Sequence, residues 1–530
     1  MQEIELKFLV PESRLKGLIR QVKVKSSQVK SLAAHYYDTP DQQLAQAGIG
    51  LRIRKEGDTW VQTIKAGGDG IAARLEHNAI LDSEQVQAMM DNNTLMPDLT
   101  IYKDTDIAPA LKEFKLKKLA KTLTRLYITD MQRTTRLLTE KGAEGTDNSI
   151  EIAYDHGEII HGNDDSQRDV IQEIEFELIS GDLDFLFMTA KTWCKLHKLC
   201  LSTVTKAERG GLLIKTQSHS PAVNADLSQL KINKKISMPA FVRAAVHNCL
   251  LQILPNSSAL VAGSTDDEHM LQLHIGISRL RAAIEAFASF SDEINPDWQP
   301  ILKQTATLLG DYRELTHLAN HIDPELQGHG SPAIDWSIDI DALKVKPIDA
   351  VRANDFQLTL LELIAFTMSD PKLEHDADKL AIDKLTKILS KHYKKCLKAD
   401  KKTHEVSDAG FDSDDADIDV NVNTDIVDED QFESELCDHL TALRYISEFS
   451  APLLSHKKAK KKTKHWLKHL IKAQTAWEQY HAHTQYQQRY QLKSLSDANA
   501  LYGVGWFAAT LEKDRKRAEK RLGKVIDSSI

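Results

Sequence analysis

The chain begins with the octet MQEIELKF (1–8), in which charged and apolar side chains alternate. A β-strand sends successive side chains to opposite faces, so this octet has one apolar face and one face made by Glu3, Glu5 and Lys7. For a single strand, the simplest interpretation is that the charged side chains face water. A site is indicated only if other strands repeat the pattern with complementary charges.

The composition is that of a globular protein with more than one domain. The 530 residues contain 42% hydrophobic and 27% charged residues, enough for two or more cores. The formal net charge of -9 argues against a dedicated nucleic-acid binder. An odd number of cysteines without a CxxC pair predicts reduced thiols in a cytoplasmic protein. We expect no signal peptide, because a charged strand begins at once, and no membrane partner, because no apolar run approaches the ~20 residues that span a bilayer.

The chain consists of two halves with different patterns of polar and apolar residues. Up to about residue 216, short segments of alternating polarity dominate: EIELKFLV, GLRIRKE, TWVQTIKA, RLEHNAIL, LYITDMQRTTRLL, IEIAYDHGEII and IQEIEFELIS. They predict an antiparallel sheet of about eight strands, large enough to curl or close. From about residue 235 onward, apolar residues recur at three-to-four spacing, which predicts helices. We therefore expect domains over 1–216 and 235–526, with 217–234 as a linker.

Several predicted strands direct like charges to one face. The basic residues on such faces are Arg52 and Arg54 in LRIR, Lys65 in TIK, Arg133 in MQRTTR, and Lys206 with Arg209 in TKAERG. The acidic ones are Glu151 and Asp155 in IEIAYD, and Glu173, Glu175 and Glu177 in QEIEFEL. The segment RLE adds Arg74 and Glu76. Acidic and basic strands are thus interspersed along the first half.

Like charges two residues apart repel each other when both leave water. Two unit charges about 4 Å apart interact by about 4 kcal/mol at an effective dielectric constant of about 20. A divalent cation compensates carboxylates, and a polyphosphate compensates arginine and lysine. A closed sheet lined with both sets therefore predicts a site for polyphosphate and metal. The alternative is a set of solvated faces on an open sheet.

The segment EIELK resembles the ExExK signature of the CYTH domains, also called triphosphate tunnel metalloenzymes. Further segments follow that family's order: YYDTPD (36–41), GLRIR (50–54), TIK (63–65), RLEHN (74–78), IEIAYDHGEI (150–159), EIEFELISGD (173–182) and LSTVTKAERG (201–210). The resemblance covers essentially the whole first half. It implies an α+β chain whose N-terminal half is a closed antiparallel β-barrel of about eight strands. The lumen of that barrel would bind triphosphate and a divalent metal, Mg²⁺ or Mn²⁺.

Family roles, carried over position by position, imply three kinds of site residue. Those that would bind phosphate oxygens are Lys7, Arg52, Arg54, Lys65, Arg74, Arg133 and Lys206. Those that would hold metal are Glu3, Glu5, Glu76, Glu151, Asp155, Glu173, Glu175 and Glu177, with either Glu173 and Glu175 or Glu175 and Glu177 as one ligand pair. Lys65 and Glu5 would be catalytic, Lys65 by activating or orienting water. Tyr36 and Asp38 are expected to fix a turn and the start of a strand.

The helical half resembles the CHAD domains, which are antiparallel helical bundles linked to polyphosphate binding. The resemblance rests on QLHIGISRLRAAIEAF (272–287), LLGDYRELTHL (308–318) and LTALRYISEF (440–449). The match is degenerate, because Leu271 and His274 stand where the family has a histidine followed three residues later by arginine. The bundle would either bind polyphosphate or stabilise the barrel. An acidic stretch predicts a disordered insertion near 405–432.

The expected function is metal-dependent hydrolysis of inorganic triphosphate (tripolyphosphate) to pyrophosphate and phosphate inside the tunnel. Family members also cyclise ATP, as adenylate cyclases do, or hydrolyse thiamine triphosphate, and the sequence shows no aromatic clamp for a nucleobase. A non-catalytic polyphosphate-binding module is the other alternative. The full set of carboxylates favours an enzyme, because binding a polyanion alone would be better served without them. The expected partners are inorganic triphosphate or polyphosphate, and the sequence identifies no partner protein.

Overall fold

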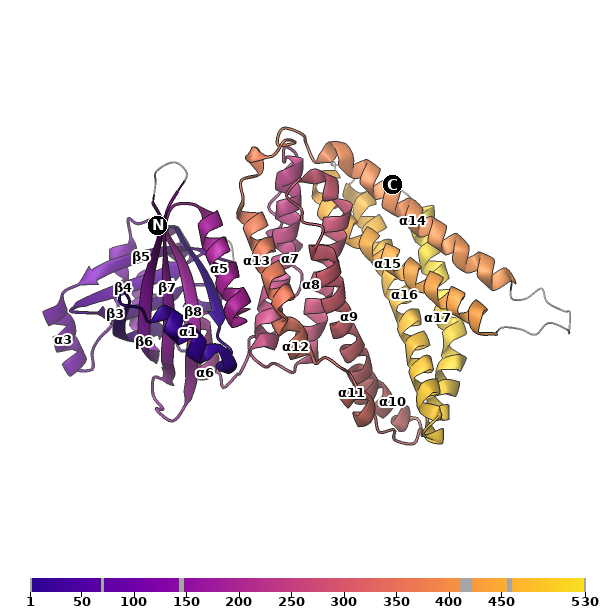
Figure 1. Ribbon diagram of the computed structural model, residues 1–530, viewed down its shortest axis with the longest axis horizontal. Coiled ribbons are helices and arrows are strands. Elements are labelled where there is room, and N and C mark those ends of the chain that lie inside the picture. The colour runs from indigo at the N-terminus through magenta and orange to yellow at the C-terminus, as the bar shows by residue number, and fades with distance from the viewer. Residues whose placement is uncertain (1, 68–70, 143–146, 410–421, 455–459, 529–530) are drawn as a thin grey trace. The chain divides into compact units, whose positions relative to one another are not determined.

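A computed structural model describes residues 2–67, 71–142, 147–409, 422–454 and 460–528 of the chain (Figure 1). The chain forms two compact units. The first comprises Met1–Asn224, Leu250–Leu273 and Pro347–Ser369. The second comprises Ala225–Cys249, His274–Lys346 and Asp370–Ile530.

A closed antiparallel β-barrel makes up most of the first unit (Figure 1). Its strands are β1 (Gln2–Leu9), β2 (Gln28–Asp38), β3 (Gly50–Glu56), β4 (Thr59–Ala66), β5 (Ala73–Leu81), β6 (Thr124–Lys141), β7 (Asp147–His161), β8 (Arg168–Ser180) and β9 (Cys200–Leu201). The order β5-β4-β3-β2-β6-β7-β8-β1 closes through a β5–β1 pairing, and the two-residue β9 adds to β1. The predicted fold class, a closed barrel of 8 strands followed by a helical region, is confirmed.

Strand β2 is the barrel strand that the alternating sequence pattern did not reveal. Its first four residues are exposed, whereas Ala34–Asp38 are all buried, so polar and apolar residues do not alternate along it. Both faces of its second half are covered. His35 and Tyr37 pack on the outside of the barrel, and Tyr36 lines the inside.

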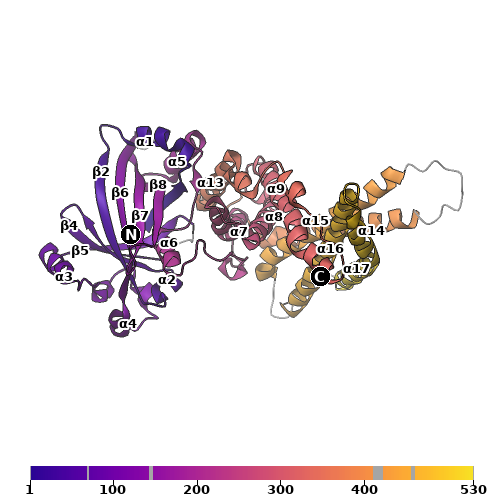
Figure 2. The same cartoon turned by 90° about the horizontal axis from the view of Figure 1, so that it is seen from below.

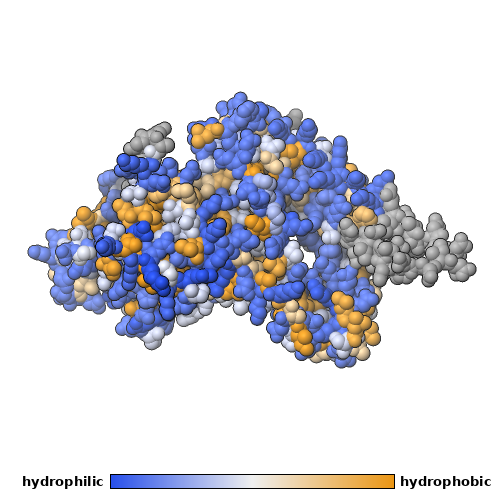
Figure 3. All heavy atoms as spheres, viewed as in Figure 1, coloured by the Kyte–Doolittle hydropathy of each residue, from blue (hydrophilic) through white to orange (hydrophobic). Residues whose placement is uncertain are grey.

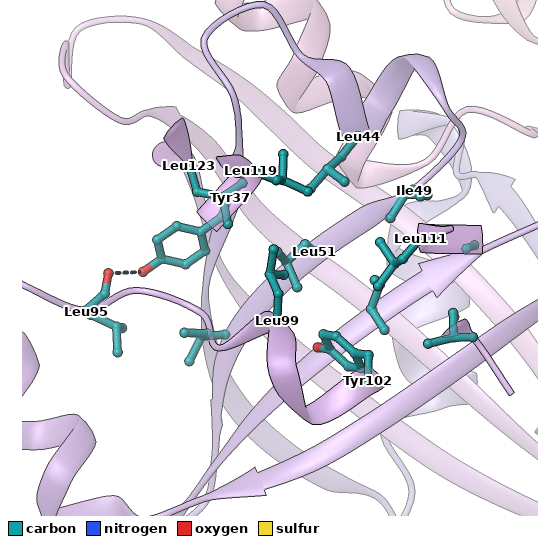
Figure 4. Packing of buried hydrophobic residues seen from close by; sticks show 14 of the residues in the cluster. Tyr37, Leu44, Ile49, Leu51, Leu95, Leu99, Tyr102, Leu111, Leu119 and Leu123 are labelled. Atoms are coloured by element: carbon teal, nitrogen blue, oxygen red, sulfur yellow. Dashed lines mark hydrogen bonds between the residues drawn. The ribbon is translucent and has the colours of Figure 1, made fainter. Parts of the chain in front are cut away.

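A hydrophobic core packs against the outer face of β2, β3 and β4 (Figure 4). It joins strand residues such as Leu51 and Tyr37 to residues of the segment between β5 and β6. The Tyr37 hydroxyl donates a hydrogen bond to the Leu95 carbonyl at 2.9 Å. Because successive residues of a strand face opposite ways, burying Leu51 in this core turns Arg52 and Arg54 into the barrel.

Six helices lie in the described part of the barrel region. These helices are α1 (Leu15–Val22), α2 (Gln43–Gln46), α3 (Ser83–Asp91), α4 (Leu116–Thr122), α5 (Leu183–His197) and α6 (Lys206–Ile214). A side chain caps the first turn of three of them, α3, α5 and α6. The Asp182 carboxylate accepts a hydrogen bond from Phe185 N at the start of α5, and Thr205 accepts one from Glu208 N at the start of α6. The cap at Thr205 fixes where α6 starts and therefore where Lys206 leaves the backbone.

The remaining helices belong to the region after residue 235. They are α7 (Met238–Val261), α8 (Asp267–Ala286), α9 (Trp298–His317), α10 (Asp323–Gly328), α11 (Ser337–Asp341), α12 (Pro347–Arg352), α13 (Asn354–Met368), α14 (Ile382–Ala409), α15 (Val422–Leu454), α16 (Lys460–Ser494) and α17 (Leu501–Asp527). Helix α14 extends to Ala409 and α15 starts at Val422, so the ends of the expected acidic insertion are helical. Residues 410–421 between them lie outside the described part of the chain.

Helix α5 packs against barrel strand β8 and against α13, all within the first unit. Both ribbon views show α5 and α13 side by side (Figures 1 and 2). The Lys191 ammonium lies 2.6 Å from a Glu362 carboxylate oxygen across this contact. In the space-filling view, hydrophilic side chains predominate and hydrophobic ones form scattered groups (Figure 3). None of the described helices is long and apolar enough to cross a membrane.

Candidate functional site

The inward side chains of the barrel strands line a cavity of about 1920 Å³. It is lined by most of the residues that the sequence singled out: Glu3, Glu5, Lys7, Arg52, Arg54, Lys65, Arg74, Glu76, Arg133, Glu151, Glu175, Glu177 and Lys206. The other two, Asp155 and Glu173, are fully buried and contact Lys206. The barrel therefore gathers all the predicted site residues in one tunnel.

Strand register sorts these side chains into rows. Glu151 of β7, Glu177 of β8 and Glu5 of β1 stand opposite one another on three adjacent strands. In the next row along the barrel, Glu175 of β8 stands opposite Lys7 of β1. Opposed residues of an antiparallel pair have Cβ atoms about 4.5–5.5 Å apart, so each row acts as one electrostatic unit.

One group of carboxylates is already neutralised by cations of the chain. Asp155, Glu173 and Glu175 have oxygens within 4.8 Å of one another. The Lys206 ammonium lies 2.8 Å from Asp155 Oδ2 and 2.6 Å from Glu175 Oε1, and it also contacts Glu173. Arg133 forms a fork on Asp155, with Nε–Oδ1 at 2.7 Å and Nη2–Oδ2 at 2.6 Å. We call these five residues the Lys206 cluster.

The Lys206 cluster is a stable set of charges despite its burial. Burial alone would raise the pKa of Glu175, but Lys206 and Arg133 hold that pKa well below its ordinary value. Burial likewise opposes the charged form of Lys206, yet the three carboxylates hold its pKa well above the ordinary value. A metal ion would have to displace the ammonium to bind here.

The row of Glu5, Glu151 and Glu177 has the opposite character, and we call it the open acidic row. Among the described residues, no lysine, arginine or histidine nitrogen lies within the 4.0 Å of an ion pair from these three carboxylates. Burial, followed by repulsion from Glu175, raises the pKa of Glu5. Burial, followed by repulsion from Glu5, raises the pKa of Glu177 to about 7. Lysines such as Lys65 lower these pKa values only from beyond ion-pair distance, whereas Lys206 lies directly against the carboxylates of its cluster.

Lys65 lies between two further carboxylates at the side of the open acidic row. Its Nζ donates to both oxygens of Glu3, at 2.8 and 2.9 Å, and lies 2.9 Å from Glu76 Oε2. Burial raises the pKa of Glu3 to about 8, whereas Lys65 lowers the pKa of Glu76 to about 2 against the effect of burial. Burial also opposes the charged form of Lys65, but Glu5, Glu3 and Glu76 raise its pKa. Lys65 is therefore a charged hydrogen-bond donor in this structure.

The third part of the tunnel is a basic wall formed by β3. Arg52 Nη1 donates to the Tyr36 hydroxyl at 3.3 Å, and the Tyr36 ring stacks on Tyr127 with centroids 4.8 Å apart. Burial and the neighbouring Arg52 lower the pKa of Arg54, which also pairs with Glu56. Two guanidinium groups that share one strand face and repel each other favour an anion between them.

Two expectations about the YYDTPD segment have different outcomes. Asp38 does hold the turn after β2, since its carboxylate accepts hydrogen bonds from Leu44 N and Ala45 N, both at 2.9 Å. Tyr36, in contrast, lines the tunnel and contacts Arg52. Its stacking partner Tyr127 was missed as well. The available signal was parity, because Tyr127 lies an even number of residues before Arg133 on β6 and so shares its face.

Two tunnel carboxyls with raised pKa values, Glu3 and Glu177, predict how stability depends on pH when metal is removed. Glu3 and Glu177 have folded-state pKa values of about 8 and about 7, above the ordinary 4.5. A carboxyl with a raised folded pKa stabilises the fold only below its unfolded pKa and loses that contribution as pH rises toward the folded value. The melting temperature in chelator should therefore fall by several degrees between about pH 5 and about pH 8. Calorimetry checks this slope, and Glu177→Gln should flatten it; a melting temperature that rises over this interval contradicts the assignment.

Comparisons with known proteins agree with this geometry. The family model of the CYTH domain matches residues 1–210, and that of the CHAD domain matches residues 244–491. The inorganic triphosphatase of Haemophilus influenzae is 31% identical over 219 residues, which cover 40% of this chain and 55% of that protein. The match thus spans about half the length of that curated relative.

Two solved structures are similar to parts of this chain. The CHAD domain from the plant Ricinus communis is 19% identical, with a TM-score of 0.41, and the match covers 57% of this chain and 97% of that one. A putative adenylyl cyclase from Hippeastrum, described as having a dominant triphosphatase activity, is 16% identical, with a TM-score of 0.28, and the match covers 41% of this chain and 96% of that one. The two family models show that the chain consists of a CYTH domain over residues 1–210 followed by a CHAD domain over residues 244–491.

Proposed function

We propose that the barrel hydrolyses inorganic triphosphate to pyrophosphate and phosphate with the help of Mg²⁺ or Mn²⁺. The observation that carries this proposal is the division of charge inside one tunnel. Carboxylates with no ion-pair partner among the described residues form the open acidic row, and the arginines of β3 form a basic wall. A triphosphate with its metal supplies both missing charges at once.

The open acidic row fits a hard divalent cation better than the Lys206 cluster does. Its donors are carboxylate oxygens only, and burial followed by repulsion between carboxylates raises the pKa of Glu5 and of Glu177, so a bound cation would relieve that repulsion. When bound, the metal would neutralise phosphate charge and polarise the bond to the leaving pyrophosphate. Of the three glutamates in the two ligand pairs that the sequence left open, we favour Glu177 as a metal ligand, because Glu173 and Glu175 contact Lys206.

Residues of the chain would hold and orient the reactants. Arg52, Arg54 and Arg74 would bind the phosphate oxygens along the wall. Charged Lys65 would orient the attacking water and stabilise the charge that develops on the terminal phosphoryl group, rather than accept a proton. Water would attack the terminal phosphorus, the bridging P–O bond would break, and pyrophosphate would leave. We assign Arg133 and Lys206 a different role from the phosphate contact that the resemblance implies, namely neutralising the buried carboxylates.

The aromatic pair in the tunnel favours an inorganic substrate. Tyr36 and Tyr127 stack on each other, and their hydroxyls contact Arg52 and the Ala207 carbonyl. Both rings are thus held as part of the wall, which supports a role in placing Arg52 rather than in clamping a nucleobase or a thiazole ring.

Polyphosphate binding by the helical region stays a prediction. His274, which lies near the family's basic position, is half-buried with Nδ1 3.0 Å from the Ala306 carbonyl, and desolvation lowers its pKa. Arg444 pairs with Glu448 at 2.9 Å and donates to Gln474. Neutral histidine and internally paired arginine support the alternative in which the bundle has a structural role.

The test is phosphate release by the full chain from triphosphate, pyrophosphate, ATP and thiamine triphosphate, with Mg²⁺, Mn²⁺ or chelator. We expect turnover of triphosphate that depends on metal and exceeds the turnover of each other substrate at least about tenfold. Fast turnover of ATP or thiamine triphosphate would identify another CYTH activity. Tight triphosphate binding without any hydrolysis would identify a binding module instead.

A further inference from the structure

The short segment Cys200–Thr205 carries two groups of the tunnel. Lys206 follows directly after this segment as the first residue of α6. Within the segment, the Val204 carbonyl accepts a hydrogen bond from the Lys7 ammonium. On one edge the segment continues the barrel, because Cys200 and Leu201 pair with β1 and Ser202 N donates to the Lys7 carbonyl at 2.9 Å. A strand this short at the edge of a sheet has little to hold its other edge.

The other edge is held by two side chains from helices α7 and α13 of the same compact unit. Leu201 N donates to Gln357 Oε1 at 2.7 Å, and Thr203 N donates to Ser258 Oγ at 3.1 Å. Both side chains are deeply buried, with Gln357 1% and Ser258 2% exposed. Each takes the place that a neighbouring strand would otherwise fill.

Gln357 and Ser258 are themselves oriented by second hydrogen bonds. Gln357 Nε2 donates to the Val351 carbonyl at 2.6 Å, and Ser258 Oγ donates to the Leu254 carbonyl at 2.7 Å. These bonds leave the Gln357 carbonyl oxygen and a Ser258 lone pair free to accept from the segment. Both residues lie beyond the CYTH match (1–210) and inside the CHAD match (244–491).

We propose that Ser258 and Gln357 are positioning residues of the tunnel. By holding Cys200–Thr205, they keep the Lys206 ammonium among its carboxylates and the Val204 carbonyl on Lys7. Loss of either bond would leave a buried N–H unpaired and would loosen the segment that carries both groups. The CHAD region is then a structural part of the catalytic barrel. The expected effect on turnover rests on the proposed function, whereas the expectation that Ser258 and Gln357 hold the segment in place does not.

The variants Ser258→Ala and Gln357→Met in the full chain remove the two acceptors with little change in volume. Ser257→Ala is the matched control, because Ser257 is 1% exposed on the same helix and its hydroxyl has no hydrogen-bond partner in the described part of the chain. Ser258→Thr keeps a hydroxyl and should restore the original behaviour. If Gln357→Met fails to fold, the smaller change at Ser258 still tests the proposal.

Two readouts are measured on each variant. Amide hydrogen exchange in peptides that contain Cys200–Thr205 should become about tenfold faster in Ser258→Ala and Gln357→Met, with the rest of the barrel unchanged. The kcat for triphosphate should fall about tenfold while KM changes little, because the basic wall is untouched. Exchange in both variants that equals exchange in Ser257→Ala would overturn the proposal. Faster exchange in a protein that hydrolyses no triphosphate would support the bracing and reject the proposed function.

Discussion

Replacing Glu5 with Gln is expected to reduce triphosphate turnover at least about 100-fold without destabilising the metal-free barrel. Glu5 is half-buried in the open acidic row, where desolvation and repulsion from Glu175 raise its pKa. An amide cannot supply the negative charge that holds a divalent metal. It also removes a repulsive charge, so the metal-free variant should melt at the original temperature or above it. Lost activity combined with equal or greater stability is the signature of a ligand, because a purely structural residue would lose both.

Two measurements distinguish a metal-binding role of Glu5 from a purely structural one. Turnover is followed with Mg²⁺ at several concentrations, and melting is compared in chelator and in excess Mg²⁺. A ligand that binds only the folded state raises the melting temperature, and this rise should be lost in Glu5→Gln. Glu158→Gln is the matched control, since Glu158 lies on the same barrel, is exposed and pairs with Arg168. Turnover in Glu5→Gln equal to that of the control would reject Glu5 as a metal ligand.

The inward face of most strands could be predicted from sequence because the period of a strand is two. Once Glu5 and Lys7 are placed inside, Ile4 and Leu6 must lie outside, and the same rule places Arg52 and Arg54. The same period of two explains why β2 and the inward position of Tyr36 were not predicted. The second half of β2 is covered on both faces, so it has no alternation to detect, and Tyr36 was assigned to a turn.

The distribution of charge inside the tunnel could not be predicted from local pattern. Glu175 and Glu177 are equivalent in the sequence, yet Lys206 pairs with the first, whereas the second has no ion-pair partner among the residues that the structure describes. That difference depends on the start of α6, which the cap at Thr205 fixes. The bond from Leu201 N to Gln357 joins residues 156 positions apart, and no periodicity signals such a contact.

Replacing Lys206 with Met is expected to be the most destabilising single change in the tunnel. Lys206 is 8% exposed and contacts Asp155, Glu173 and Glu175, of which the first two are fully buried. Removing one partner of a buried ion pair costs about 3–5 kcal/mol, because the remaining charges stay buried without compensation. For a domain of this size the melting temperature should fall by about 10 °C. Thermal denaturation at neutral pH measures the loss, and Lys215→Met, at the exposed end of the same helix, is the control.

The pH dependence of this loss separates neutralisation from phosphate binding. Lys206 and Arg133 hold the folded-state pKa of Glu175 well below 4.5, so Glu175 adds stability above that pH and loses this contribution as pH falls toward its folded pKa. Without Lys206 this contribution is reduced, because only Arg133 still pairs with Glu175. The difference in melting temperature between the original and the variant should therefore shrink below about pH 4.5, and adding Glu173→Gln should recover part of it at neutral pH. If Lys206 served only to bind phosphate, Lys206→Met would raise KM for triphosphate and leave melting unchanged at every pH, because no buried carboxylate would depend on its charge.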